Sequence, residues 1–536
     1  MARMPNYRFL SIHQTTLYTL VSFFILFISP SLSSFSFSPN TTCNLTPYPT
    51  FCTTTLPPQY LSIHDQCHFF LIQSLSITKT IIEEVSSYLR DQSYIHVSTT
   101  HALEDCLNLA QLNIDFLSNV LQAIENTVTN YQAYNFQTML SAILTNQNTC
   151  LDGFHEVTPY PRITTALLNS LSDGIKLYSI SLALFTHGYV SGHGTGKLTF
   201  ERKLLQNTSI DNNVVVREKV VVNLDGSRDF TTINDAVEAA PNNTGTNNGY
   251  YVIYVVTGVY YEYVSIAKSK QNVMIVGDGI NRTVITGNRS VIDGWTTFQS
   301  ATFAVVGEGF VAVNISFRNT AGSNKHQAVA VRNGADMSTF YNCNFEGYQD
   351  TLYTHSFRQF YKNCNIYGTI DFIFGNSAAI FQDCFMYPRL PMQNQFNAIT
   401  AQGRTDPNQN TGMCIQNCYI VASYELGDAT NNYNKMKTYL GRPWKEYSRT
   451  VYMQSFIDKL IDPKGWMEWS GNFGLSTLYY AEFGNWGPGS NTSKRVTWEG
   501  YHLINGNDAD HFTVYKFIQG DTWLPMTGVP FKAGLH

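Results

Sequence analysis

The clearest hydrophobic pattern lies in the first third of the chain. No glycine or proline occurs between Gln59 and Asp152, and apolar residues recur there at alternating steps of four and three. This spacing is typical of the apolar stripe of a long amphipathic helix in a bundle. The stripe consists of Leu103, Leu107, Ala110, Ile114, Leu117, Leu121, Ile124 and Val128. The segment therefore predicts an all-α domain.

The pattern changes after Val220. Glycine becomes frequent, and short β-rich runs alternate with turns, as in YYVIYVV at residues 250–256. Cysteines recur at intervals of 21 and 20 residues, at Cys343, Cys364 and Cys384. A repeat of about twenty residues, rich in β-formers and without helical periodicity, predicts a parallel β-solenoid. The chain thus joins a helical domain to a β domain.

Two aspartates share this period. Asp350 in GYQDTLY and Asp371 in GTIDFIFG are 21 positions apart. Successive coils of a solenoid lie about 4.8 Å apart, so residues one period apart become neighbours on one face. Gln349 directly precedes Asp350, and Gln327 lies 22 positions before Gln349. We therefore expect two carboxylates and two carboxamides to lie together on three successive coils.

Composition narrows the class of protein. The chain has 536 residues, of which 14% are charged and 14% aromatic, so it is long enough for at least two domains and too apolar to be disordered. The net charge of −5 gives no indication of a nucleic-acid partner. The thirteen histidines are scattered, and no HExxH, CxxC or GxSxG pattern occurs. We expect no metal site and no cofactor, and the chemistry is not that of an ordinary serine esterase.

The N-terminal segment has the features of a targeting signal. Arg3 and Arg8 precede an apolar run from Leu17 to Ile28, which is short for a membrane span. We interpret residues 1–35 as a signal peptide, with an uncleaved signal anchor as the alternative. Ten cysteines and several Asn-x-Ser/Thr sequons fit entry into the secretory pathway. The sequons include Asn40, Asn44, Asn207, Asn242, Asn281, Asn288, Asn314 and Asn491.

The two halves are joined at residues 191–206. Gly192, Gly194 and Gly196 loosen the backbone there, and the dibasic sequence FERKLLQ follows at residues 200–206. One interpretation is a site for a processing protease at residues 202–205, RKLL. The other is an ordinary charged linker.

Several motifs of the β half occur in the order found in one enzyme family. They are VVNLDGSRDFTTINDAVEAAP (221–241), TGVYYEYV (257–264), ITGNRSVIDGWTTFQSATFAV (285–305), FRNTAG (317–322), LGRPW (440–444) and GWMEW (465–469). With the aspartates and glutamines, they make residues 207–536 resemble the catalytic domain of plant pectin methylesterases. The resemblance implies a right-handed parallel β-helix.

The helical half resembles pectin methylesterase inhibitor proteins over residues 40–190. The resemblance rests on CNLTPYPTFC (43–52), ALEDCL (102–107) and TNQNTCLDGF (145–154). It implies a four-helix bundle with two disulfides in sequence order, Cys43–Cys52 and Cys106–Cys150. Cys67 falls outside this pattern, and we expect it to be a free buried thiol.

The resemblance also assigns roles at the proposed site. Asp371 would be the nucleophile that attacks the C6 carbonyl of a methylated galacturonate, and Asp350 would protonate methanol and then activate water. Arg442 would keep Asp371 ionised. Gln327 and Gln349 would stabilise the oxyanion, with a structural amide ladder as the alternative.

Substrate contacts are expected from residues in or near these motifs. Aromatic rings pack on the C–H faces of sugars, although core packing is the alternative for any single ring. Thr297, in GWTTF, matches a substrate-contacting position of the family, and Gln327 and Arg442 would also touch the substrate. The aromatic candidates are Tyr353, Phe374, Trp444 and Trp466.

The cysteines of the β half allow more than one pairing. Cys364 and Cys384 fall one coil apart, inside the range of a disulfide, and the resemblance also suggests that they are bonded. The period alone would equally permit Cys343 to pair with Cys364. We expect the remaining cysteines, including Cys414 and Cys418, to be buried free thiols.

These observations predict a secreted pectinesterase of the plant cell wall (the apoplast), reached through the ER and Golgi. It would release methanol from methylated homogalacturonan as a monomeric mature enzyme, with its helical domain serving inhibition or maturation. An inhibitor protein and a processing protease are further expected partners, whereas a nucleic acid and a stable membrane anchor are not expected. The alternatives are a pectate lyase or polygalacturonase, which would cut the glycosidic bond, and a non-catalytic pectin-binding protein.

Overall fold

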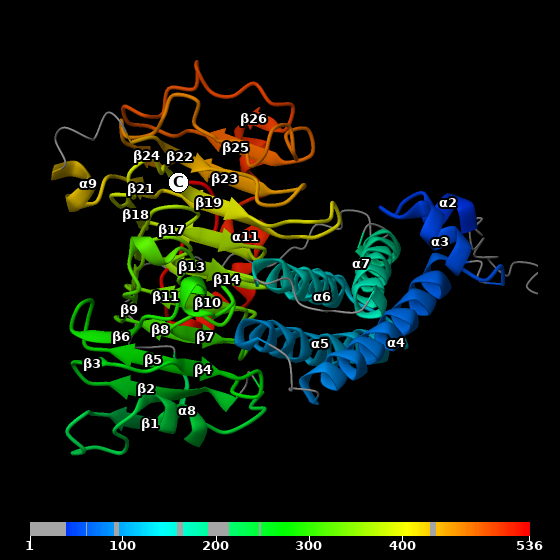
Figure 1. The fold of residues 1–536 in the computed structure, drawn as a ribbon, viewed down its shortest axis with the longest axis horizontal. Coiled ribbons are helices and arrows are strands. Elements are labelled where there is room, and N and C mark those ends of the chain that lie inside the picture. Colours follow the sequence, from blue (N-terminus) through cyan, green and yellow to red (C-terminus); the bar gives the residue numbers. More distant parts are fainter. Residues whose placement is uncertain are drawn as a thin grey trace, which may run out of the picture.

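The computed structural model describes residues 39–59, 62–90, 96–157, 165–190, 214–245, 248–428 and 436–536. The expected signal peptide at residues 1–35 and the expected processing site within residues 191–206 lie outside this part of the chain. The described residues form a helical region and a β region that lie against each other (Figure 1).

Four long helices make up most of the helical region. α6 begins at a capping box, in which the side chains of Thr129 and Gln132 each accept a backbone N–H of the other residue. The expected apolar stripe ends as a helix at Ile124, and Val128 enters the core from the turn before α6. Each long helix packs on two of the others in a four-helix bundle. The helices are α2 (Pro39–Cys43), α3 (Pro49–Thr55), α4 (Ile63–Arg90), α5 (Val97–Ile124), α6 (Asn130–Glu156), α7 (Thr165–Phe185) and the short π-turn η2 (Thr186–Val190).

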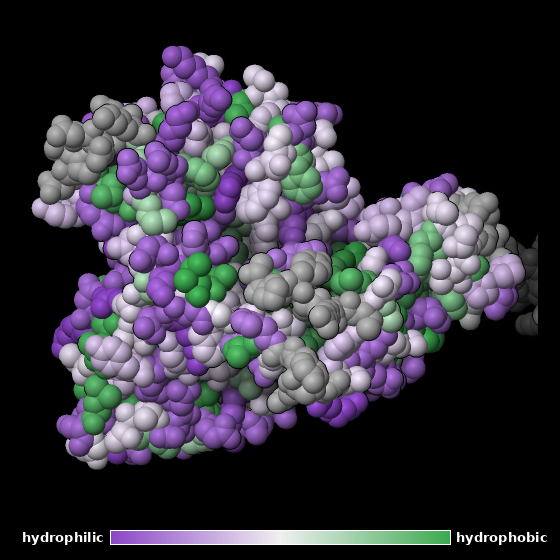
Figure 2. Space-filling view, in the orientation of Figure 1, coloured by the Kyte–Doolittle hydropathy of each residue, from purple (hydrophilic) through white to green (hydrophobic). Residues whose placement is uncertain are grey.

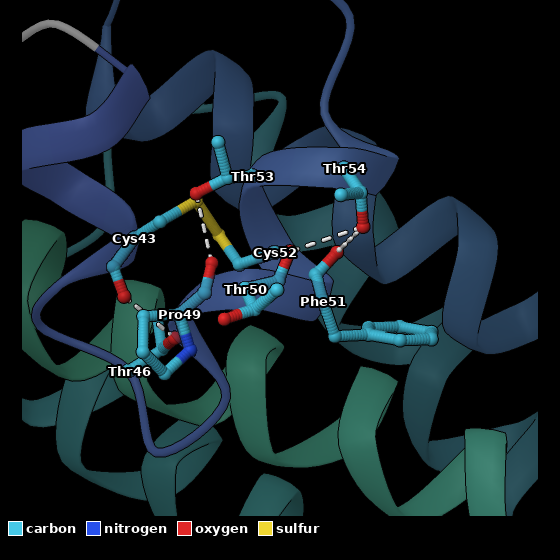
Figure 3. Close-up of a disulfide and its surroundings, with 8 residues drawn as sticks. All are labelled: Cys43, Thr46, Pro49, Thr50, Phe51, Cys52, Thr53 and Thr54. Atoms are coloured by element: carbon cyan, nitrogen blue, oxygen red, sulfur yellow. Dashed lines mark hydrogen bonds between the residues drawn. A yellow bond between two sulfur atoms is a disulfide. The ribbon is translucent and has the colours of Figure 1, made fainter.

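Two disulfides close the helical region, at the pairs expected from the sequence. Cys43–Cys52 joins α2 to α3 with a Cα–Cα distance of 5.5 Å (Figure 3). Cys106–Cys150 joins α5 to α6 with a Cα–Cα distance of 4.6 Å. Cys67 is a buried free thiol, as expected.

The β region is a stack of parallel strands in three sheets. The 11-stranded sheet contains, in spatial order, β1 (Val216–Val222), β2 (Tyr250–Val255), β5 (Val273–Gly277), β8 (Val311–Val313), β11 (Ser338–Tyr341), β14 (Arg358–Lys362), β17 (Ala378–Gln382), β20 (Gly412–Gln416), β23 (Arg449–Met453), β25 (Tyr479–Phe483) and β26 (Tyr501–Leu503). The 7-stranded sheet contains β22 (Thr438–Gly441), β19 (Asn397–Gln402), β16 (Ile373–Gly375), β13 (Leu352–Thr354), β10 (Val331–Asn333), β7 (Phe303–Val305) and β4 (Val264–Ile266). The 8-stranded sheet contains β24 (Phe456–Ile457), β21 (Tyr419–Ile420), β18 (Phe385–Pro388), β15 (Asn365–Gly368), β12 (Asn344–Glu346), β9 (Ser316–Asn319), β6 (Thr283–Gly287) and β3 (Gly258–Tyr260).

Each coil between β2 and β22 contributes one strand to each sheet. The chain runs through β13, β14 and β15, and β16 then begins beside β13, with Leu352 opposite Ile373 and Tyr353 opposite Phe374. This register is the 21-residue period seen in the sequence. Aliphatic and aromatic side chains from successive coils fill the interior, where Phe340, Tyr361 and neighbouring rings stack.

The expected disulfide between Cys364 and Cys384 is not formed, and that prediction was wrong. Both cysteines are buried free thiols, as are Cys343, Cys414 and Cys418. The parallel register points each thiol of the stack toward a carbonyl of the preceding coil: Cys364 Sγ donates to Phe340 O at 3.4 Å, and Cys384 Sγ to Tyr361 O at 3.4 Å. The sulfurs of Cys364 and Cys384 therefore each have a hydrogen-bond partner without a covalent one.

Short elements cover the remaining surfaces of the β region. α8 (Ile233–Ala239) packs on β1, β2 and β4, whereas residues from β17, β20, β23 and the C-terminal segment share a second core. The other short elements are η4 (Val291–Asp293), η5 (Ser323–Lys325), α9 (Tyr424–Asp428), α10 (Gly506–Asp510), α11 (Val514–Phe517), η6 (Gly520–Thr522) and η7 (Leu524–Thr527). Among the described residues, no helix has the length and apolar character needed to cross a membrane.

The helical region docks on the side of the β-helix (Figure 1), and one face of α6 contacts the β region from Tyr134 near its start to Glu156 at its end. Polar contacts join the two regions along this boundary, for example from Ser179 to Asp406 at 2.5 Å and from Arg358 to Asn135 at 2.9 Å. Leu109 of α5 packs in a shared apolar cluster with the β region. On the visible face the two regions meet closely, and hydrophobic residues form only small groups (Figure 2).

Candidate active site

Asp350 and Asp371 lie on adjacent coils, each just before a strand of the 7-stranded sheet. The Asp350 N–H donates to Ile370 O at 3.1 Å, and the Ala328 N–H donates to Gln349 O at 3.2 Å. These bonds tie together the three coils that carry the expected carboxylates and carboxamides. Both aspartates have positive φ angles, 63° and 51°, a conformation that costs energy in a residue with a side chain. Each turn therefore holds its carboxylate in a specified direction.

Arg442 contacts only one of the two aspartates. Its Nε donates to Asp371 Oδ1 at 2.8 Å and its Nη2 to Oδ2 at 2.6 Å, a bidentate pair. The guanidinium lies 4.1 Å from the ring centre of Trp469 and 5.1 Å from that of Phe396. The Arg442 side chain is therefore held by an ion pair with Asp371 and by cation–π contacts with two rings.

The two carboxyls differ in proton affinity. Burial raises the pKa of both, because only 7% of Asp350 and 5% of Asp371 is exposed. The charge of Asp371 raises the pKa of Asp350 further, whereas hydrogen bonding to Arg442 holds the pKa of Asp371 down. The proton shared by the pair therefore belongs on Asp350, and Asp371 carries the charge.

These residues line a cavity of about 210 Å³. Most of the side chains expected at the site face it, and the set includes both acids and carboxamides. Phe298 and Trp469 also line the cavity and were not singled out from the sequence. Its β-region lining is Thr296, Thr297, Phe298, Gln327, Gln349, Asp350, Tyr353, Asp371, Phe374, Ala401, Arg442, Trp444 and Trp469.

Three rings form an aromatic wall in the cavity. Tyr353 and Phe374, opposite each other in the register, stack with ring centres 4.2 Å apart. Trp444 packs edge-on against Phe374 at 5.9 Å. Behind it, a side chain at Gly403 would lie 2.8 Å from the indole, so glycine is needed there for the ring to fit. The wall presents apolar faces of the size of a sugar ring.

Trp466 was expected at the substrate groove, and the structure places it elsewhere. Its side chain is fully buried in the β-helix interior and stacks on Tyr480 with ring centres 4.1 Å apart. Trp469, at the other end of the same GWMEW motif, faces the cavity instead. The motif contains two tryptophans, and only the path of the chain after Trp466 distinguishes the ring in the β-helix interior from the ring that faces the cavity. Phe298 could have been found from the sequence, because it directly follows Thr297, which was already expected to contact the substrate.

Helix α6 closes the cavity from the other side. Its contribution to the lining is Thr149, Asp152, Gly153 and Glu156. The Thr149 hydroxyl hydrogen bonds with His355 Nε2 at 3.0 Å, and Asp152 forms an ion pair with Lys445 at 2.6 Å. Glu156 Oε2 accepts the backbone N–H of Thr297 at 2.9 Å. The helical region thus occupies the approach to the acidic pair.

No cluster of three or more His, Cys, Asp or Glu side chains suited to a metal ion occurs in the described part of the chain. Fold and cleft together define a parallel β-helix protein with a buried pair of carboxyl groups in its cleft. Comparison with known proteins gives the family. The pectinesterase family profile matches residues 219–521, and the profile of plant invertase and pectin methylesterase inhibitors matches residues 38–184.

Similar full-length proteins share both regions. Probable pectinesterase/pectinesterase inhibitor 41 of Arabidopsis thaliana is 49% identical over 93% of this chain and 95% of its own length. Pectinesterase 2 of Citrus sinensis is 43% identical over 96% of this chain and 99% of its own length. The solved pectin methylesterase from carrot is 51% identical, with a TM-score of 0.58, over 62% of this chain and all of that one.

The chain belongs to the pectinesterase family and carries an inhibitor-like helical domain at its N-terminus. It is a carboxylic ester hydrolase that acts on pectin. The predicted fold class, a helical bundle followed by a right-handed parallel β-helix, is confirmed.

Proposed function

We propose that the enzyme hydrolyses methyl esters of galacturonate through an acyl-enzyme on Asp371. The Asp371 carboxylate attacks the C6 carbonyl, and the side-chain N–H groups of Gln327 and Gln349 stabilise the oxyanion. As the C–O bond to the methoxy group breaks, the Asp350 carboxylic acid gives it a proton and methanol leaves. Asp350, now a carboxylate, takes a proton from water, which attacks the acyl carbonyl and frees Asp371.

The observation that carries this assignment is the one-sided pairing of Arg442. Its bidentate contact with Asp371 keeps that carboxylate charged and oriented, whereas burial and the Asp371 charge favour the proton on Asp350. The two steps require these two protonation states.

The test is methanol release from highly methylated pectin, with the polymer length followed by viscosity. Asp371→Ala should abolish methanol release, and Glu499→Ala, which removes an exposed carboxylate of the β region, should not change it. Loss of viscosity without methanol would instead identify a glycosidic-bond enzyme. Equal methanol release by the Asp371→Ala variant would refute the nucleophile assignment.

The helical region acts as an inhibitor within the same chain. Its helix α6 lies over the cavity and bonds to its walls at Thr297, His355 and Lys445, so it occupies space that a polymer needs in order to reach the acidic pair. Activity therefore requires cleavage near residues 202–205 and departure of the helical region. Methanol release should be low for the intact chain and rise after cleavage; equal rates before and after would refute the inhibition.

The mature enzyme acts in the plant cell wall after secretion. Its two disulfides and its polymeric substrate support an extracellular setting.

The exposure of each sequon asparagine in the folded protein indicates which of them can carry an N-glycan. Asn314 is half-buried in the coil stack, whereas five others are exposed. Those five are Asn44, Asn242, Asn281, Asn288 and Asn491. Mass spectrometry of the secreted protein, with and without glycosidase, tests both points.

A further inference from the structure

Arg389 lies outside the catalytic cavity, directly after β18. This strand pairs with β15, and β15 pairs in turn with β12. The chain leaves β12 and β15 through the turns that carry Asp350 and Asp371, so Arg389 begins the corresponding turn of the third coil. It is not among the residues that line the cavity. An effect of Arg389 on the reaction would therefore pass through other residues.

The Arg389 guanidinium reaches back across one coil to the turn of Asp350. Its Nη1 donates to Gly347 O at 2.9 Å, and its Nη2 donates to the Tyr348 hydroxyl at 2.9 Å. The guanidinium carbon also lies 3.8 Å from the centre of the Tyr348 ring. Gly347 and Tyr348 directly precede Gln349 and Asp350. One side chain thus contacts both the backbone and a side chain of the segment that leads into the two reacting groups.

The backbone of Arg389 contacts the second turn. Its N–H donates to Gly368 O at 2.7 Å, just before the turn of Asp371. The two turns are also joined to each other, since the Thr369 N–H donates to Tyr348 O at 2.8 Å. Both aspartates have positive φ angles, and such conformations persist only where surrounding contacts fix them. Arg389 supplies contacts of this kind to both turns from outside the cavity.

Glu425 of α9 orients the guanidinium. Its Oε1 accepts a hydrogen bond from Arg389 Nε at 2.7 Å, and its Oε2 accepts one from Nη2 at 3.3 Å. The side chains of Arg389 and Glu425 are 21% and 38% exposed, and an ion pair with this exposure adds little to stability. A carboxylate that bonds to two guanidinium nitrogens does, however, fix the plane of the group. The pair is therefore better suited to orientation than to stabilisation.

We propose that Arg389 is a positioning residue for the reaction and that, oriented by Glu425, it holds Gln349 and Asp350 in place relative to Asp371. The proposal rests on the esterase function proposed above. The rate depends steeply on this placement, because an error of about 1 Å in the position of a reacting group can cost about a hundredfold. Loss of Arg389 therefore lowers the rate of the chemical step, although the residue does not touch the substrate cavity.

Loss of these contacts should also change the pH dependence. Asp350 must hold a proton to release methanol. Burial raises its pKa most, and the charge of Asp371 raises it further; Glu156 acts upward while α6 is docked, and Arg442 acts downward. A looser turn admits water and moves Asp350 away from Asp371, and both changes lower the pKa of Asp350. The basic limb of the kcat/KM profile should therefore move to lower pH in an Arg389 variant.

The experiment uses the full chain with a protease site introduced within residues 191–206, folded intact, cleaved, and separated from its helical fragment. Methanol release from highly methylated pectin gives kcat and KM across pH. Arg389→Ala should lower kcat about thirtyfold, change KM by less than about twofold, and shift the basic limb to lower pH. Arg318→Ala is the matched control and should change none of these values. It breaks a bidentate pair with Glu346 on the same sheet, with side chains 32% and 22% exposed.

A milder variant removes only the orienting charge. Glu425→Gln should lower kcat about threefold, and adding it to Arg389→Ala should cause no further loss, because Glu425 acts through the guanidinium. Additive losses in the double variant would overturn the proposed role of Glu425. An Arg389→Ala enzyme with unchanged kcat and pH profile, or with a change in KM alone, would overturn the positioning role of Arg389.

Hydrogen–deuterium exchange, followed by mass spectrometry, gives a readout that does not require activity. The Asp350 N–H donates to Ile370 O, and the peptide that contains it should exchange about tenfold faster in Arg389→Ala than in the wild type or in Arg318→Ala. An unchanged exchange rate would overturn the inference. If the wild type releases no methanol, the proposed chemistry fails, and the exchange rate still decides whether Arg389 holds the turn.

Discussion

Docking of the helical region on the β region should weaken as pH rises, because the buried carboxyl group of Asp105 must lose its proton. A variant of Asp105 that cannot ionise tests this. Asp105 of α5 is 2% exposed at the boundary with the β region. It accepts hydrogen bonds from the Thr296 hydroxyl at 2.5 Å and from Gln299 Nε2 at 2.8 Å. Burial raises its pKa to about 7; the hydrogen bonds and Arg332 act downward, and Glu156 acts upward. Departure of the β region removes both hydrogen-bond donors and admits water to the carboxyl, so its pKa should fall toward the ordinary value of 3.8.

The sign follows from which state holds the proton. Below about pH 4 both states are protonated and docking is strongest. Between about pH 4 and pH 7 only the docked state keeps its proton, so each pH unit weakens docking about tenfold for this group alone. A pKa raised from 3.8 to about 7 corresponds to about 4 kcal/mol of docking free energy lost by neutral pH. Glu156 adds a similar dependence, because burial raises its pKa to about 7 as well.

The assay is the dissociation constant of the two fragments of the cleaved chain between pH 4.5 and pH 6.5, by analytical ultracentrifugation. For the wild type, the logarithm of the dissociation constant plotted against pH should have a slope of about two, one for each of the two carboxyl groups that release a proton. Asp105→Asn keeps the shape and one acceptor oxygen but cannot ionise, so the slope should fall to about one. Asp115→Asn is the control, since it removes an exposed carboxylate of the same helix that pairs with Lys268. An unchanged slope in Asp105→Asn would refute the reasoning.

The remaining predictions concern the cleft. Asp371→Asn should lower kcat for methanol release by at least about a thousandfold, and a smaller loss in a steady-state assay would contradict the nucleophilic role. Gln349→Ala should cost about a hundredfold in kcat with little change in KM, since an oxyanion donor acts in the transition state; an effect confined to KM would argue for a structural amide. Arg442→Lys should let the pKa of Asp371 rise, so the acidic limb of the kcat/KM profile should move to higher pH, and an unmoved limb would be evidence against the pairing. Trp466→Ala should destabilise the fold by about 3–5 kcal/mol in urea unfolding, whereas Trp469→Ala should mainly raise KM; the reverse result would show that the two rings were assigned wrongly.

Local features of the sequence determined the architecture of each half. A 21-residue period in a β-rich segment predicts a parallel solenoid, in which each coil pairs with the next in register. That register brought Asp350 beside Asp371 and Tyr353 beside Phe374, and it could be predicted because stacking depends only on spacing along the chain. The helix stripe around Leu103 was predictable for the same reason, since it repeats at a fixed local step.

Tertiary structure decided what depends on direction and on distant contacts. The spacing placed Cys364 and Cys384 on adjacent coils, but in the structure both are free thiols that donate to backbone carbonyls. The GWMEW motif contains Trp466 and Trp469, and only the packing of the interior shows that the second ring faces the cavity.

The docking of α6 over the acidic pair is the clearest case. Asp152 and Lys445 are 293 positions apart, and no periodic pattern connects a bundle helix to a solenoid coil. The sequence by itself determined two folds and one set of reacting groups, because those follow from local repeats. The placement of one fold across the other's site arises from complementary side chains on two separately folded surfaces, and only the assembled structure contains that information.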